Sequence, residues 1–239
     1  MHFHLPKPLH GWREFAGEVG IIVLGVLIAL GAEQIAQSIH ERGQARDAES
    51  EVRGELAHNI AMLRSRWAVR HCVENRVDEL QRLIDSAHRD GAIATPNWVG
   101  RPQFWTMQLA QWGATSQSGR ATLLPPEELA LYASLYSFMN NVNALSAEEQ
   151  MDWARLRALE HLQRLTPEMT FQLTNTLQEA RYINWRMGIW TIQIGVLADR
   201  LHLPAGRNDI PPSRSACIPM STPREQAIRQ SNSAFGSEP

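Results

Sequence analysis

The residues that could bind a metal or act as nucleophiles are scattered in this sequence. Nine histidines are present, yet none forms an HExxH motif or a helical pair beside a carboxylate, the patterns that bind zinc. The motifs GxSxG, GxxxxGKS/T and GxGxxG of hydrolases, P-loop proteins and dinucleotide-binding domains are absent too. We therefore predict no catalytic, cofactor-binding or metal-binding residue and expect a protein that is not an enzyme.

Carboxylates and arginines alternate in the segment that follows the most apolar stretch of the chain. Residues three or four apart lie side by side on a helix, so opposite charges at these spacings form local ion pairs. We interpret them as a solvated helix face and not as an acid–base pair. They are Glu33, Glu49, Glu51 and Glu55 with Arg42, Arg46 and Arg53.

The two cysteines, Cys72 and Cys217, lie far apart and have neither CxxC nor Cys/His ligand spacing. A zinc ribbon or a thioredoxin-like redox centre is therefore not indicated. At most they form one disulfide, and two unpaired thiols are the alternative. If they pair, the bond would strap the C-terminal segment along a helix.

Aromatic residues concentrate in a connecting segment that glycines and prolines interrupt. Such a cluster either plugs one end of a helical bundle or lines a binding groove. Because no polar group converges nearby in the sequence, we favour the plug, and an enzymatic site at this segment is the alternative. The residues are Trp98, Phe104, Trp105 and Trp112.

Composition describes one globular unit with appendages. The chain has 239 residues, of which 44% are hydrophobic and 20% charged, enough apolar material for one ordinary core. The formal net charge of −2 provides no cationic field of the kind that nucleic-acid binding requires. We predict no nucleic-acid partner.

The most apolar stretch, residues 15–36, predicts a transmembrane helix. Residues 19–32 carry no polar side chain. At about 1.5 Å per residue, 15–36 spans roughly 33 Å, against a hydrocarbon core of about 30 Å. The alternative is a signal peptide cleaved near residue 31, but Glu14 and Glu18 stand against it and helical character continues beyond that point. We therefore predict an anchor in the lipid bilayer.

Orientation and self-association are less strongly encoded. Lys7 and Arg13 before the apolar stretch balance Arg42 and Arg46 after it, and the N-terminal amine favours an inward N-terminus. We expect a bacterial inner-membrane protein whose C-terminal domain is periplasmic, where a disulfide could form.

Small residues recur on one face of the apolar helix and predict a homo-oligomer. They are Gly25, Ala29, Ala32 and Ala36.

Beyond the membrane, hydrophobic periodicity predicts an all-α fold. A long amphipathic helix continues from the transmembrane helix to about Arg89, with Gly91 as its stop and Gly43 or Gly54 as weak points. A short helix is expected over 103–112 and another from Pro126. Either a second helix begins at Ser146 or one long helix bends through Asn143, and the last helix runs from Thr166-Pro167 to about 203. Two or three later helices thus pack with the long helix as a bundle.

Four regions follow from this reading of the sequence. Residues 1–14 are an N-terminal segment, 15–36 the transmembrane helix and 37–203 the bundle domain. Residues 204–239 are rich in proline, serine and arginine, a composition that predicts a disordered tail.

The opening stretch resembles a family of uncharacterised single-pass bacterial membrane proteins, a domain of unknown function. There a Gly-Glu pair precedes an aliphatic run with an internal glycine and a closing Ile-Ala-Leu. These are Gly17-Glu18, Gly25 and Ile28-Ala29-Leu30 here, followed by a fainter likeness in Ser118-Gly119, Leu123-Leu124, Glu128-Leu129 and Tyr132 to Tyr136. Glu33-Gln34 replaces the family's Asn-Trp. The resemblance implies an anchor and no known activity.

These observations together predict a membrane-anchored helical binding, scaffold or sensory module with an unknown protein partner. An enzyme of unassigned reaction near the tryptophan segment is the first alternative. The second is an exported soluble protein from which the signal has been cleaved.

Overall fold

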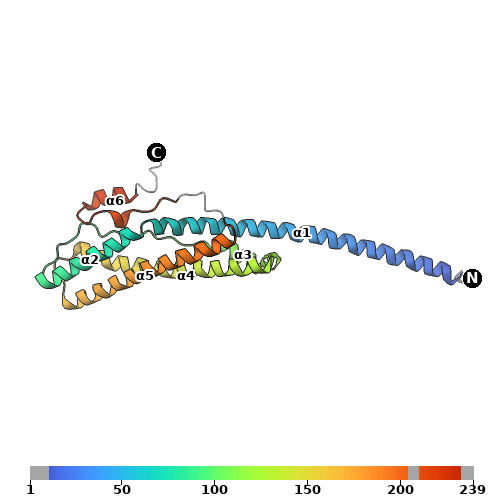
Figure 1. The fold of residues 1–239 in the computed structure, drawn as a ribbon, viewed down its shortest axis with the longest axis horizontal. Helices are drawn as coiled ribbons and strands as arrows, with labels where there is room; N and C mark the ends of the chain where they lie inside the picture. Colours follow the sequence, from blue (N-terminus) through green and yellow to red (C-terminus); the bar gives the residue numbers. More distant parts are fainter. Residues whose placement is uncertain (1–10, 204–209, 233–239) are drawn as a thin grey trace, which may run out of the picture.

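The structure, a computed structural model, describes residues 11–203 and 210–232, which form helices and no β-strand. The α-helices are α1 (Trp12–Ala68), α2 (Arg70–Asp90), α3 (Ala110–Gln117), α4 (Pro126–Leu156), α5 (Pro167–Arg200) and α6 (Arg224–Asn232). Short 3-10 helices are η1 (Arg120–Leu123), η2 (Arg157–His161) and η3 (Ser215–Cys217). The predicted all-α bundle with a long N-terminal helix is confirmed (Figure 1).

The two halves of the 57-residue helix α1 have different surroundings. Figure 1 shows the first half extending away from the bundle. Its apolar side chains, such as Ile21, Leu24 and Ile35, are exposed, whereas Ala48 and Val52 begin a buried side that continues into the bundle core. Within the described residues, α1 is long and apolar enough to cross a membrane, and no protein covers its most apolar window.

The predicted uninterrupted helix to Arg89 is wrong at one position. α1 ends at Ala68 and α2 begins at Arg70, while Gly43 and Gly54 remain helical. Between them Val69 has φ −106° and ψ 11°, which redirects the chain so that α2 packs on α5. The predicted stop holds: Gly91 follows α2 in the left-handed conformation, with φ 72°.

Two apolar clusters fill the bundle. One lies where the second half of α1 meets α4 and the C-terminal half of α5, and it contains Leu56, Tyr136 and Met187. The other joins α2, the end of α4 and the N-terminal half of α5, with Leu80 and Leu177 at its centre. α4 and α5 therefore form the shared wall of both clusters.

The boundaries of α4 and α5 follow local signals in the sequence. Of the two possibilities at Ser146, the structure has one continuous helix, Pro126–Leu156. Asn143 does not interrupt it, because its side chain bonds the backbone of Met107 from within the helix. Thr166 caps α5 by accepting a hydrogen bond from the N–H of Met169 at 3.2 Å, and α5 ends at Arg200.

The short helix expected over 103–112 lies later, at Ala110–Gln117. The chain before it has no regular secondary structure, and side-chain amides supply hydrogen bonds to its backbone in place of helical ones. Asn59 donates to the carbonyl of Gln108 at 2.7 Å and accepts from its N–H at 2.8 Å. Contacts with α1 and α4 therefore outweigh the local helical pattern.

The expectation of a disordered tail is wrong for residues 210–232. They include η3 and α6 and fold back beside α2, as Figure 1 shows. Ala216, Ile218 and Ala227 are buried. Their partners lie elsewhere in the chain, so composition alone could not reveal the order. The remainder of that predicted tail, together with residues 1–10, lies outside the described residues.

The backbone at Ser215 lies so close to Gly100 that a substitution at Gly100 tests this packing. Gly100 has φ 69°, and an added Cβ would lie 2.5 Å from the Ser215 carbonyl oxygen. We expect Gly100→Ala to lower the free energy of unfolding by about 1–3 kcal/mol, measured by denaturant titration. An added Cβ at Gly113, within α3, meets nothing within 4 Å, so Gly113→Ala should be neutral or stabilising. Equal losses in both variants would contradict the described packing.

Candidate functional site

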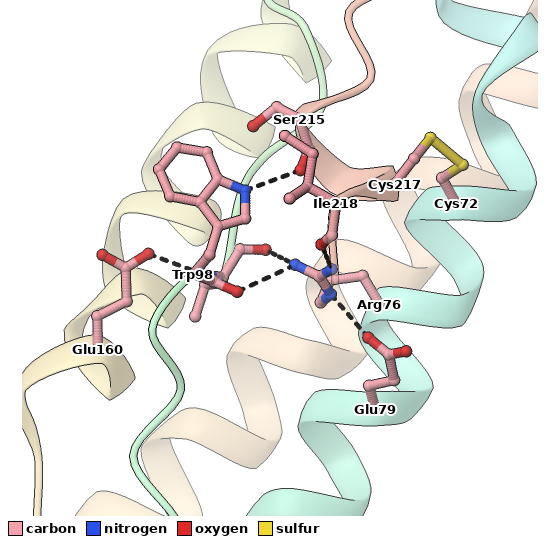
Figure 2. Close-up of polar contacts among 9 residues, drawn as sticks. Cys72, Arg76, Glu79, Trp98, Glu160, Ser215, Cys217 and Ile218 are labelled. Carbon is pink, nitrogen blue, oxygen red and sulfur yellow. Dashed lines mark hydrogen bonds and ion pairs between the residues drawn. A yellow bond between two sulfur atoms is a disulfide. The ribbon is translucent and has the colours of Figure 1, made fainter. Parts of the chain in front are cut away.

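The predicted disulfide pair and one of the predicted tryptophans meet at a single junction, drawn in Figure 2. The structure joins Cys72 of α2 to Cys217 of η3. The indole N–H of Trp98 donates to the carbonyl of Ser215 at 3.0 Å. Trp98 packs with Ile218 in a small buried cluster. The C-terminal segment is thus held both covalently and by packing.

Arg76, one turn beyond Cys72 on α2, is the polar centre of this junction. Only 2% of it is exposed. Its guanidinium donates to the carbonyls of Trp98, Val99 and Ile218, and its Nε bonds Glu79 at 2.8 Å. Burial lowers the pKa of Arg76, and the hydrogen bond to Glu79 opposes that shift. One buried cation therefore fastens two remote backbone segments to α2.

Glu160 of η2 holds the same segments from the opposite side. Its carboxylate is buried, accepts the N–H of Val99 at 2.9 Å and bonds the Arg224 guanidinium at 2.5 Å. Figure 2 shows Arg76 and Glu160 on either side of the chain at Trp98. Their donors and acceptors are used within the protein. We interpret the junction as a structural lock and not as a ligand site.

The four aromatic residues predicted to form a plug or a groove do not lie together in the structure. Trp98 is buried in the lock, and Trp112 stacks on Tyr136 with ring centroids 5.1 Å apart. Trp105 packs half-buried against the first apolar cluster, and Phe104 is exposed. The structure therefore distributes these aromatic side chains and does not bring them around a common hollow.

The small residues predicted for helix packing, Gly25, Ala29, Ala32 and Ala36, lie on the uncovered part of α1. An added Cβ at Gly25 would meet nothing within 4 Å. No contact within the described chain requires a small residue there. Their role in self-association stays a prediction.

A groove of about 500 Å³ between α4 and α5 is the better candidate for ligand binding. Its walls include Met151, Tyr182 and Ile183, and it also contains charged side chains. Met151 and Tyr182 are more than half exposed. Sequence patterns did not reveal this groove, because it forms only where two distant helices lie side by side. Its charged residues are Glu148, Asp152, Arg155 and Glu179.

Asp152 is the residue of this groove whose pKa is shifted. The pKa of Asp152 is raised from 3.8 to about 6, chiefly by burial and also by the negative charge and hydrogen bond of Glu179, while Arg155 opposes the shift. Arg155 lies 3.1 Å from the Asp152 carboxylate. Three carboxyls and one guanidinium leave the groove with an excess of negative charge at neutral pH. Such a surface suits a basic group that carries an apolar portion.

Comparison of the chain with protein-family models, curated proteins and solved structures returns no match. The resemblance of the opening stretch to single-pass bacterial membrane proteins therefore stays a prediction.

Removal of the Arg76 side chain should release the lock. In Arg76→Met the three carbonyls lose their donor, and we expect the free energy of unfolding to fall by about 3 kcal/mol or more. Limited proteolysis should cut within 210–232 faster than in the wild type. Arg82→Met, an exposed change on the same helix, is the matched control. Unchanged cleavage in Arg76→Met would contradict the role of Arg76.

The raised pKa of Asp152 predicts a pH dependence of stability. Between about pH 4 and 6 the native chain binds more protons than the unfolded chain, so the free energy of unfolding falls as pH rises through this window. Asp152→Asn should be about 1–3 kcal/mol more stable than wild type at pH 7 and equal to it at pH 3.5. Denaturant titrations across this range, with exposed Asp85→Asn as control, measure the effect. Parallel wild-type and Asp152→Asn curves would contradict it.

Proposed function

We propose that this chain is a single-pass protein of the bacterial inner membrane whose periplasmic helical bundle acts as a binding, scaffold or sensory module. The observation that carries the proposal is the continuity of α1. One helix runs from the uncovered apolar stretch into the bundle core, without a linker between anchor and domain. A helix shared in this way supports an anchor over a cleaved signal, because cleavage near residue 31 would leave exposed apolar residues such as Ile35 in water.

The Cys72–Cys217 disulfide supports the periplasmic orientation. Disulfides persist in oxidising compartments and are rare in the cytosol, where thiols are kept reduced. The same bond joins residues 145 positions apart, and such a link would stabilise a domain in the periplasm. The Gly17-Glu18 motif supports membership of the membrane-protein family that the opening stretch resembles.

Binding is the activity that the groove between α4 and α5 supports. Its apolar walls offer contact area to a partner, and its carboxyls favour a positive charge on that partner. The alternative of an enzymatic site at the tryptophan segment has no supporting geometry, since those side chains lie in different surroundings. A basic, partly apolar protein segment is the class of partner we propose.

Membrane retention of the full chain tests the anchor. Wild-type protein should resist alkaline extraction, and a C-terminal reporter active only in the periplasm should give signal. Because an arginine at the bilayer centre costs about 2.5–3.5 kcal/mol, Leu24→Arg with Leu27→Arg should release the protein from the membrane fraction. Gln37→Arg, beyond the apolar stretch, should leave retention unchanged.

The outcomes separate the remaining alternatives. Soluble periplasmic protein lacking its first residues by intact mass would reject the anchor in favour of a cleaved signal. Reporter activity only in the cytoplasm would reject the orientation. Thiol labelling before and after reduction gives an independent readout of orientation, because Cys72 and Cys217 react only after reduction if they reach an oxidising compartment.

A further inference from the structure

No described residue covers the face of α1 that points away from the bundle core over residues 43–54. Gly43, Ser50 and Gly54 are exposed there, and an added Cβ at either glycine would meet nothing within 4 Å. A groove of about 370 Å³ follows this face and includes Ser50, Gly54 and Ala57. A glycine inside a helix costs about 1 kcal/mol relative to alanine, and no contact within the described chain offsets that cost here.

Charges of opposite sign border this bare face on its two sides. At about 100° per residue, Arg42 and Arg46 lie on one side of Gly43, while Asp47 and Glu51 lie on the other. Arg42, Arg46 and Asp47 are exposed and form no hydrogen bond or ion pair with the described residues. Glu51 is paired with Arg120 at 3.1 Å and is itself 42% exposed. Arg42, Arg46 and Asp47, which have no partner among the described residues, thus give the two borders of this face complementary charges.

We infer that a second copy of this chain packs in parallel against this face. In a parallel pair related by a two-fold axis along the helices, the basic side of each copy faces the acidic side of the other. In an antiparallel pair, like charges would face each other. The side chain of Arg42 then reaches along the interface towards the partner's Asp47, and that of Arg46 towards the partner's Glu51, a five-residue offset that matches the pairing of flanking charges in parallel coiled coils.

The same face continues into the membrane stretch. Gly25, Ala29, Ala32 and Ala36 lie in line with Gly43 along α1, and small residues allow two helix backbones to approach closely. Anchoring in a bilayer holds two copies in the same direction, which favours the parallel arrangement. The parallel direction of the two copies rests on the proposed anchoring, whereas the charge pattern supports their pairing independently. The two bundles would then lie on opposite sides of the paired helices.

Disulfide trapping of the full chain in phosphatidylcholine vesicles tests this interface. Cys72 and Cys217 are bonded to each other, so Gly43→Cys introduces the free thiol of the trap. Under mild oxidation we expect Gly43→Cys to form covalent dimers at least about fivefold more than Ser38→Cys, which lies roughly 140° away around the helix. Equal trapping at both positions would overturn the interface.

Charge reversal tests the parallel direction. In the Gly43→Cys background, Arg42→Glu should reduce the yield of covalent dimer about fivefold, because the new carboxylate of each copy would face Asp47 of the other copy. The double change Arg42→Glu with Asp47→Arg should restore the yield, because it places opposite charges together again. Failure of the double variant to restore trapping would overturn the charge pairing. If the protein is soluble without vesicles and the Gly43→Cys variant still forms covalent dimers, the anchor is rejected and the interface is retained. Failure of the anchoring proposal can therefore be distinguished from failure of the pairing.

Discussion

The whole arrangement depends on α1 being one helix that passes through two environments. Its first part exposes apolar side chains that no described residue covers, and this stretch is long and apolar enough to cross a membrane. Its second part buries one side against η1, α3, α4 and α5, and no described residue covers the other side. Because the backbone stays helical through both parts, no flexible joint separates the apolar stretch from the bundle.

The bundle around this helix is closed by polar contacts as much as by apolar ones. Arg66 of α1 bonds Glu149 of α4 at 2.6 Å and Asn184 of α5 at 2.9 Å, all of them buried. Tyr136 donates to Glu55 at 2.7 Å, and burial together with that carboxylate raises the pKa of the phenol. Such contacts specify which helices meet, since an unpaired partner would be costly inside the core.

The C-terminal segment completes the domain through the lock of Arg76, Glu160 and the disulfide. A segment with little apolar content cannot order itself, so its order is supplied by groups on α2, η2 and the loop at Trp98. This closure places the segment on α2, away from the groove between α4 and α5 and from the bare face of α1. Both surfaces thus remain open.

The sequence by itself determined the elements whose signals are local. The apolar stretch 15–36, the cap at Thr166 and the stop at Gly91 act within a few residues, so each was predicted from its neighbours. Tertiary structure alone decided the break at Val69, the order of 210–232 and the groove at Asp152, because each depends on groups far apart in the chain. Periodicity shows which side of a helix is apolar, but only packing decides which partner covers that side and which side stays bare.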